Sequence, residues 1–416
     1  MGLRSATSFT CLLLSEIITV PLAFWFISTP HAIVYTILIF PALLWLSFLL
    51  YGWFIKLQPS KPFIGSEQQA SAKRVGGHGK HVLTSDGRIV EYIVYGSDRD
   101  DADVIIQMHG AGCTAGIVCE WNASMLKQLN IKGIAPTMPG SGYSDIQIDR
   151  RIVNYPKDDV LPILKAENVN EFFVDGFSLG TAHALSIARY FGVGGSGYDD
   201  HQCVGVGLNC PYLSTPICAE FQMRCDADDM WLVRHNDTQK WSAAWNYALW
   251  DLLFYVPYIS PPAKFFGDVW PKWAQACPEQ VEQLIRDQTR TVVRGSQGQG
   301  CEAMHYTTQS MWGFDPREVN VKNVCVWYAQ DDCLSPGAGS PPEHGEWLAK
   351  MFQNKQEEAD GSSGAGESQK VRLSIRAENV GRGHMTYAPS KGAAYTVVEE
   401  TIPQTLLQMV KQTKEK

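Results

Sequence analysis

The sequence predicts an α/β fold in which an eight-stranded, mostly parallel sheet carries helices on both faces, with a helical cap and with two transmembrane helices in front. Three observations predict it. Short β-rich runs alternate with helical patterns after about residue 80, a helix-like stretch interrupts this alternation, and two long apolar stretches occupy the first 55 residues. The chain has 416 residues, of which 45% are apolar, so it can build a large core.

At the amino-terminal end, two apolar stretches cover residues Phe9 to Ile27 and Ala32 to Ile55. Each is long enough to cross about 30 Å of hydrocarbon as a helix. Glu16 is the single charged residue within them. Residues 1–58 are therefore predicted to form a membrane anchor with two spans in the bilayer. A cleaved signal peptide and a monotopic hairpin bent at the prolines of the two stretches are the alternatives.

Basic residues flank this pair of stretches but are absent from the link between them. They are Arg4 before the pair and Lys56, Lys61, Lys73 and Arg74 after it. Because Lys and Arg collect on the cytosolic side of membrane proteins, both flanks are expected in the cytosol, and the rest of the chain with them. An endomembrane such as the endoplasmic reticulum is the expected location.

Charge and cysteine spacing exclude several functions. The formal net charge of -8 and the pI near 5.7 leave no concentrated basic surface, so nucleic acid is excluded as a partner. The eleven cysteines occur singly, with no CxxC pair, and this signals neither a zinc site nor a disulfide framework. Neither a metal nor a cofactor is expected, and the sequence specifies no protein partner.

After a polar linker over residues 59–79, strands and helices alternate. Eight strands are predicted, at His81–Thr84, Ile89–Tyr95, Val104–Met108, Gly133–Thr137, Phe172–Asp175, Val204–Leu208, Val324–Tyr328 and Val371–Ile375. Helices are predicted at Ala115–Leu129, Asp158–Glu167, Leu179–Tyr190, Glu343–Phe352 and Ala393–Lys411. Such alternation implies a parallel sheet covered on both faces, with ligands bound at the carboxyl ends of its strands.

Two segments interrupt this pattern. Residues 211–319 are helix-like and hold seven of the thirteen tryptophans, which predicts a helical cap inserted between two parts of the core, 80–210 and 320–416. Residues 354–370 lack apolar side chains that could offset the entropy of ordering, so a mobile loop is predicted there.

The sequence around Ser178 carries the strongest chemical signal. The apolar run of the fifth predicted strand leads into Gly176-Phe-Ser178-Leu-Gly180 and then into an alanine-rich helix. This G-x-S-x-G pattern is typical of a nucleophile elbow, in which glycines on both sides remove β-carbons that would clash. The helix start adds a positive dipole end and a free backbone N–H for an oxyanion. The alternative is an ordinary glycine-flanked turn.

Four further groups of residues follow predicted strands in a fixed chain order. They are His109-Gly-Ala-Gly112, Met138-Pro-Gly-Ser-Gly-Tyr-Ser144, Asp331-Asp332 ahead of Pro336, and Gly383-His384. Together with the elbow, they resemble the α/β-hydrolase superfamily over residues 80–411. More narrowly, three segments resemble a capped, esterase-like branch of it: Ser85-Asp-Gly-Arg88, Pro139-Gly-Ser-Gly-Tyr-Ser-Asp145 and Trp312-Gly-Phe-Asp315.

The resemblance implies a catalytic triad in the chain order of α/β hydrolases. Ser178 is the implied nucleophile, and His384 is the implied general base. Asp332 is the implied acid that orients the imidazole, with Asp331 as the alternative. A serine at the elbow argues against epoxide hydrolases and haloalkane dehalogenases, which carry an aspartate there.

The resemblance also assigns the oxyanion hole to the backbone N–H groups of Ala111 and Leu179. His109 is expected to orient the loop that holds Ala111, and a role as catalytic base is the alternative. The remaining histidines are expected to be surface or core residues: His78, His81, His183, His201, His235, His305 and His344. Thr137 and Thr181 depart from the family pattern, in which an aspartate and a glycine are common, and neither is expected to touch the triad.

The predicted activity is hydrolysis of an ester through an acyl-enzyme intermediate. The aromatic side chains of the predicted cap favour a small apolar or lipid-like ester, although they could equally form the cap's own core or contact the bilayer. A catalytically silent binding protein with the same fold is one alternative. Thioesterase, peptidase and haloperoxidase activities are the others.

Overall fold

The computed structural model describes residues 76–110, 113–145, 147, 151–223, 312–330, 332, 340–361, 371–378 and 401–414, together with five helical residues between 42 and 50. Apart from those five residues, the predicted spans lie outside this part of the chain, as do most of the linker and residues 224–311 of the predicted cap. No helix within it is both long enough and apolar enough to cross a membrane.

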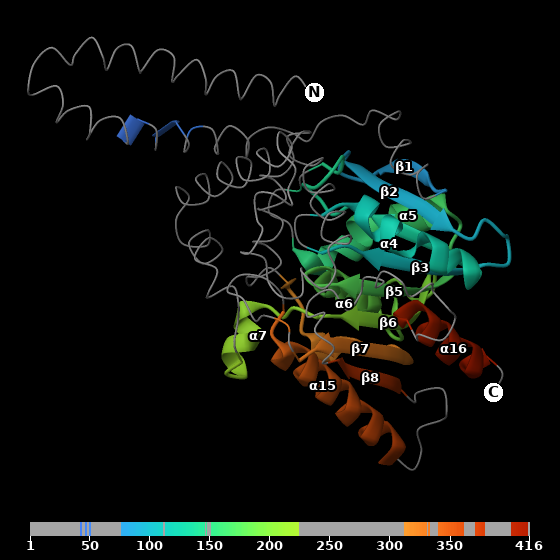
Figure 1. The fold of residues 1–416 in the computed structure, drawn as a ribbon, viewed down its shortest axis with the longest axis vertical. Coiled ribbons are helices and arrows are strands. Elements are labelled where there is room, and N and C mark those ends of the chain that lie inside the picture. Colours follow the sequence, from blue (N-terminus) through green and yellow to red (C-terminus); the bar gives the residue numbers. More distant parts are fainter. Residues whose placement is uncertain are drawn as a thin grey trace, which may run out of the picture.

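The eight predicted strands are confirmed, with ends that shift by up to three residues. They are β1 (His78–Leu83), β2 (Ile89–Gly96), β3 (Asp103–Met108), β4 (Ile131–Pro136), β5 (Glu171–Phe177), β6 (Gln202–Asn209), β7 (Asn323–Ala329) and β8 (Arg372–Glu378). They form one sheet in the order β1-β2-β4-β3-β5-β6-β7-β8 (Figure 1). β2 is antiparallel to both of its neighbours, and all other neighbouring strands are parallel.

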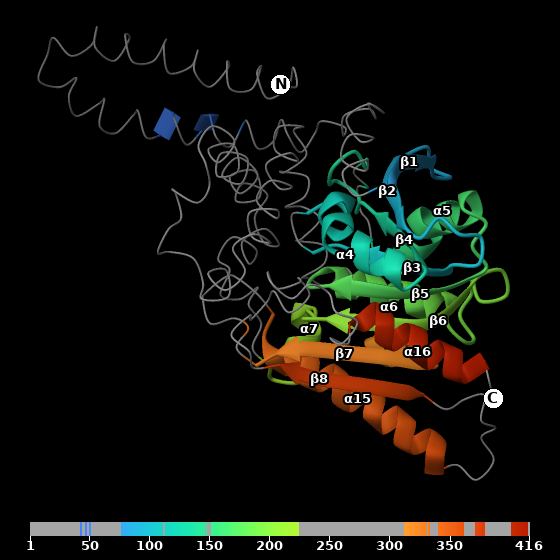
Figure 2. The same cartoon turned by 45° about the vertical axis from the view of Figure 1, so that its right-hand side comes forward.

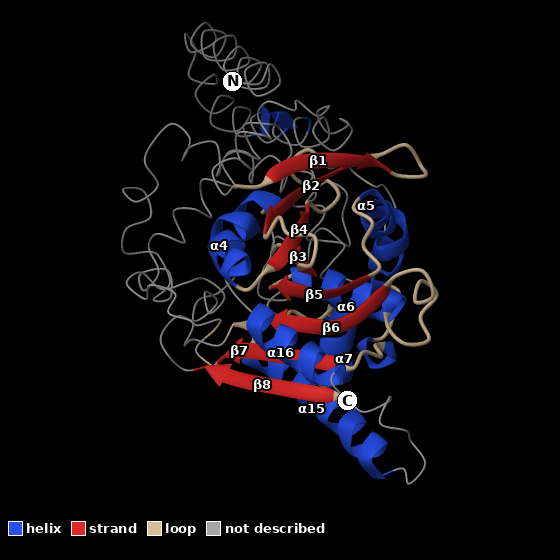
Figure 3. Ribbon diagram, turned by 90° about the vertical axis from the view of Figure 1, so that its right-hand side faces the viewer, coloured by secondary structure: helices blue, strands red, loops and turns tan. Residues whose placement is uncertain are grey.

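Helices cover both faces of the sheet (Figure 3). They are α4 (Ala115–Gln128), α5 (Leu161–Ala166), α6 (Gly180–Phe191), α15 (Pro342–Gly361) and α16 (Ile402–Lys414). Helices α4 and α16 pack on one face with a cluster that contains Ile105 and Phe173, while α5, α6 and α15 pack on the other with Ile106 and Val174. Consecutive residues of a central strand thus point into opposite cores. Because both cores are apolar, the central strands are unbroken apolar runs.

The strand order reverses beside β3, because the chain continues from β3 to β4 on one side and later returns to β5 on the other. Met108 at the end of β3 is level with Gly176 near the end of β5. Parallel strands of this kind open a crevice at their carboxyl ends where the order reverses. The loops after β3 and β5 therefore meet at the edge where the fold predicts a site.

Strand β6 has glycines where α16 crosses it. A β-carbon at Gly207 would lie 2.3 Å from Cγ2 of Ile402, and one at Gly205 would lie 3.2 Å from Cδ2 of Leu406. The absence of β-carbons at these two positions lets the helix approach the strand backbone closely.

The predicted mobile loop at 354–370 is wrong over its first half, because α15 continues to Gly361. Lys, Gln, Glu and Ala dominate residues 354–359 and are strong helix formers even without apolar neighbours. The side-chain amide of Gln353 donates to Glu357 at 3.3 Å, one turn further along the helix. Residues 362–370 lie outside the described part of the chain.

Candidate active site

Ser178 occupies a tight turn between β5 and α6, as the elbow motif predicts. Its φ is +56°, in the left-handed region that non-glycine residues rarely adopt. A β-carbon at Gly176 would lie 2.5 Å from the carbonyl oxygen of Gly180, and one at Gly180 would lie 2.5 Å from that of His109. Both flanking glycines are therefore sterically required, and the backbone N–H of Ser178 is fixed by the carbonyl of Asn209 at 2.9 Å.

The loop after β3 passes directly beside this serine. A β-carbon at Gly110 would lie 3.3 Å from Cβ of Ser178, so the backbone of this loop passes close to the side chain of Ser178. Leu179 is the residue that precedes α6, and no acceptor for its backbone N–H is found among the described residues. The predicted partner donor, Ala111, follows Gly110 and lies outside the described residues.

His109 is fully buried and holds two loops together. Its Nε2 accepts from the backbone N–H of Met138 at 2.9 Å, so Nδ1 carries the proton and donates to the carbonyl of Gly110 at 2.8 Å. Burial lowers the pKa of His109 to about 4, which keeps the ring neutral. These contacts support the expected role of His109 in orienting the loop, because neither nitrogen is available to Ser178.

Asp332 follows β7 and is almost completely buried. Its backbone N–H donates to the carbonyl of Ala329 at 3.3 Å, so the chain turns sharply as it leaves the strand. Asp332 thus lies at the same edge of the sheet as Ser178, with β6 between their two strands. Asp331 and His384 lie outside the described part of the chain.

Three other histidines belong to the core, as expected. Nδ1 of His201 contacts the carbonyl of Val169 at 2.6 Å. The ring of His183 meets Tyr155 edge to face, with 4.7 Å between the ring centroids. His344, in the first turn of α15, is buried, and its Nδ1 accepts from the backbone N–H of Leu213 at 3.1 Å.

Thr181 was expected not to touch the triad, and this is wrong. Its hydroxyl donates to the carbonyl of Ser178 at 2.6 Å and accepts from the backbone N–H of Tyr212 at 3.1 Å. The signal was present in the sequence, because a threonine in the first turn of a helix commonly returns its hydroxyl to a carbonyl three or four residues earlier.

The motif Ser85-Asp-Gly-Arg88 supports the rim of this edge. The guanidinium of Arg88 binds the buried carboxylate of Asp159 at 2.8 Å and that of Asp86 at 2.7 Å. The carboxylate of Asp145 accepts from the backbone N–H of Ile89 at 2.7 Å. The start of β2 is thereby tied to the loop after β4.

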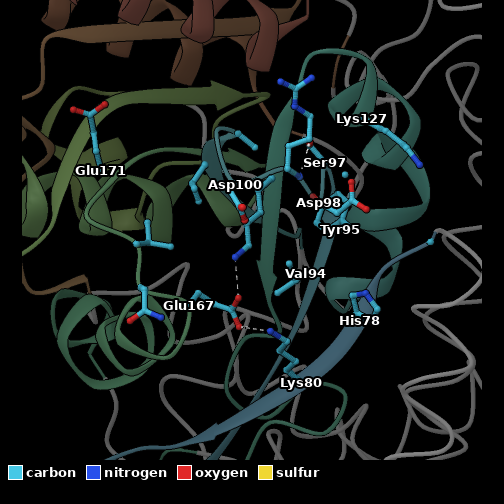
Figure 4. Close-up of a pocket in the computed structure, with 18 of the residues that line it drawn as sticks. His78, Lys80, Val94, Tyr95, Ser97, Asp98, Asp100, Lys127, Glu167 and Glu171 are labelled. Carbon is cyan, nitrogen blue, oxygen red and sulfur yellow. Dashed lines mark hydrogen bonds and ion pairs between the residues drawn. The ribbon is translucent and has the colours of Figure 1, made fainter.

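A cavity of 490 Å³ opens at the opposite edge of the sheet (Figure 4). Lys80 and Lys132 line this cavity, and both bind the carboxylate of Glu167, at 2.7 and 3.0 Å. Glu171, which lines this cavity, begins β5, whereas Ser178 directly follows its end, roughly 20 Å away at 3.3 Å per residue. The cavity is therefore separate from the candidate active site.

The strand order, the left-handed serine after β5 and the loop after β3 together define an α/β-hydrolase fold. No protein-family model and no curated protein matches the chain.

Among solved structures, the enol-lactonase from Burkholderia xenovorans LB400 is 14% identical, with a TM-score of 0.44, and the match covers 72% of this chain and 91% of that one. An esterase from Exiguobacterium antarcticum is 13% identical, with a TM-score of 0.46 and coverage of 71% and 90%. The naproxen esterase from Bacillus subtilis is 10% identical, with a TM-score of 0.42 and coverage of 77% and 90%. The fold assignment rests on the strand order and the elbow rather than on these likenesses.

The neutral, buried state of His109 predicts a pH dependence of stability. In the unfolded chain its imidazole binds a proton near the ordinary pKa of 6.5, whereas in the folded chain it does so only near 4. Protons therefore favour unfolding between pH 6.5 and 4, and the free energy of unfolding should fall by roughly 3 kcal/mol across this window.

His109→Gln should remove this contribution, because the glutamine carbonyl can still accept from the Met138 N–H but does not titrate. Urea unfolding of both proteins at several pH values between 7 and 4 measures the difference. Parallel curves for the two proteins would contradict the assignment.

Proposed function

We propose that this protein is a membrane-anchored serine hydrolase that cleaves carboxylic esters on a triad of Ser178, His384 and Asp332. The observation that carries the proposal is the left-handed Ser178, with the backbone at Gly110 close to its side chain and the start of α6 directly after it. A strained serine held between sterically required glycines has no structural purpose that another residue would not serve at lower cost.

The acid and the nucleophile have a spacing that suits this chemistry. The Ser178 N–H binds the carbonyl of Asn209, and the N–H of Cys210 binds the carbonyl of Trp327 at 2.8 Å, so the ends of β5, β6 and β7 form one row. Neighbouring strands lie about 4.8 Å apart, which separates β5 from β7 by about 10 Å. An imidazole between the serine hydroxyl and the aspartate carboxylate fills such a gap, and His384 follows β8 by six residues.

In the first half of the reaction, Oγ of Ser178 attacks the ester carbonyl carbon while His384 takes the hydroxyl proton. The N–H groups of Leu179 and Ala111 stabilise the tetrahedral oxyanion, each by a few kcal/mol. The intermediate then expels the alcohol, which receives the proton from His384. Water, deprotonated by His384, then attacks the acyl carbon, the bond to Oγ of Ser178 breaks as Oγ takes the proton back from His384, and the carboxylic acid leaves. Asp332 holds the imidazole in the required tautomer throughout.

A lipid-like ester is the substrate class that the rest of the sequence favours. Two apolar stretches in the first 55 residues would hold the domain at a bilayer, and residues 211–319 carry seven tryptophans that can line an apolar roof.

Ser178→Ala should abolish covalent labelling by a fluorophosphonate probe and ester hydrolysis, because the attacking oxygen is lost. Ser186→Ala is the matched control, since Ser186 is a buried serine of α6, the helix that follows Ser178, and its hydroxyl donates to the carbonyl of Ile152 at 2.7 Å. Labelling is followed by gel fluorescence, and hydrolysis with p-nitrophenyl esters of increasing acyl length.

Folded wild-type protein that does not label would refute the enzyme and favour a binding protein. Activity confined to the shortest esters would argue against a lipid-like substrate.

Asp332→Asn should lower kcat by roughly 10³- to 10⁴-fold with a smaller change in KM, because an amide stabilises the wrong imidazole tautomer. Asp331→Asn should leave kcat within about threefold, since a loss of the larger size requires direct contact with the imidazole. Steady-state ester hydrolysis by the two variants decides which aspartate is the acid, and the opposite ranking would transfer the role to Asp331.

Protein expressed in full should float with microsomal membranes after alkaline carbonate washing, because two spans resist extraction. In sealed microsomes, added protease should digest the hydrolase domain, since the basic flanks favour a cytosolic location. A domain that is protected until detergent is added would contradict this topology, and release by carbonate would contradict the anchor.

A further inference from the structure

Thr181 lies in the first turn of α6, three residues after the nucleophile, and is completely buried. Its hydroxyl makes two hydrogen bonds in opposite directions. It donates to the carbonyl oxygen of Ser178 at 2.6 Å, and it accepts from the backbone N–H of Tyr212 at 3.1 Å. The same carbonyl also receives the Thr181 backbone N–H at 3.0 Å.

The carbonyl of Ser178 and the N–H of Leu179 belong to one peptide unit. Because that unit is planar and its C=O and N–H point in opposite directions, an anchor on the oxygen also fixes the direction of the N–H. A hydrogen bond to the carbonyl further polarises the N–H of the same unit. Two donors from Thr181 on the Ser178 oxygen therefore hold and strengthen the N–H of Leu179.

The other end of the Thr181 bridge is itself held firmly. Tyr212 belongs to the loop between β6 and α7 (Thr215–Glu220), which lies at the carboxyl edge of the sheet (Figure 2). The carbonyl of Cys210 in this loop accepts from the hydroxyl of Ser340 at 2.7 Å. The N–H of Leu213 donates to His344 at 3.1 Å, and Cys218 in α7 contacts Nε2 of the same ring at 3.2 Å. The first turn of α15 thus braces the loop on which Thr181 depends.

We propose that Thr181 is a positioning residue that aims the Leu179 N–H at the substrate oxyanion, with the loop at 210–213 as its support. The inference rests on the proposed function, because it assigns a role within the same site. Glycine, which is common at this position in α/β hydrolases, has no hydroxyl that could make this bridge. The bridge therefore depends on the threonine at this position.

Thr181→Val removes the hydroxyl and keeps the shape of the side chain, whereas Thr181→Ser keeps the hydroxyl. We expect Thr181→Val to lower kcat about tenfold or more, with KM within about twofold, because the lost contact acts on the transition state rather than on substrate binding. The inhibition constant of a trifluoromethyl ketone, whose adduct carries the oxyanion, should rise by a similar factor. Thr181→Ser should restore both values to within about threefold.

Rates are normalised to the number of sites that a fluorophosphonate probe titrates, so that an unfolded fraction does not count. Ser186→Ala, which also loses a buried hydroxyl bond to a carbonyl, is the matched control and should lower thermal stability with unchanged kcat per titrated site. Thr181→Ala and Thr181→Cys serve in place of valine if that variant does not fold.

Unchanged kcat and inhibitor affinity per site in Thr181→Val would overturn the inference while the hydrolase assignment stands. Equal losses in Thr181→Val and Thr181→Ser would overturn it as well, because the hydroxyl would then not be the cause. A wild-type protein that does not react with the probe would overturn the proposed function, and this inference with it.

Discussion

The left-handed backbone at Ser178 is the constraint on which the arrangement of the carboxyl edge depends. The turn can form only because Gly176 and Gly180 let the strand, the helix and the loop after β3 approach within contact distance of one another. The backbone N–H of Ser178 donates to the carbonyl of Asn209, so β6 must lie beside β5 in a fixed register. The neighbouring strand β6 is also followed by a left-handed residue, since Cys210 directly after it has a φ of +46°. The neighbouring strands β5 and β6 are therefore each followed directly by a residue in the left-handed region.

Helices on both faces of the sheet pack against the strands and loops that form this carboxyl edge. Helix α16 packs closely on the glycines of β6, the strand that lies between β5, which leads to Ser178, and β7, which leads to Asp332. On the other face, Ser340, just before α15, and His344, in its first turn, both bind the loop after β6. Strand β7, which leads to Asp332, and the start of α15 are thus both connected to the elbow by hydrogen bonds that run through β6 and its loop.

Much of this fold could be predicted from local patterns, because a parallel central strand is a short apolar run and an elbow is a glycine-flanked serine between a strand and a helix. Ser178, Leu179 and Asp332 were found in this way at the carboxyl ends of their strands. The strand order and the approach of Gly110 to Ser178 could not be derived from spacing, because they depend on contacts between residues far apart in sequence. The contact of Thr181 with the Ser178 carbonyl is local and follows from helix chemistry, whereas its second partner, Tyr212, is 31 residues away and could not be predicted from spacing. The end of α15 could not be predicted from apolar content, because residues 354–359 are polar but have high helix propensity.

The backbone at Ser178 also shapes how this protein can change in evolution. A residue other than glycine in the left-handed region costs roughly 1–2 kcal/mol of folding free energy. A glycine costs roughly 0.5–1 kcal/mol, because it loses more conformational entropy on folding. The net penalty for keeping a serine there is therefore about 1 kcal/mol, a small part of the stability of a domain of this size. Selection for stability alone favours glycine at position 178 only weakly. A lineage that no longer needed the hydroxyl would lose it by drift, and the flanking glycines would outlast it.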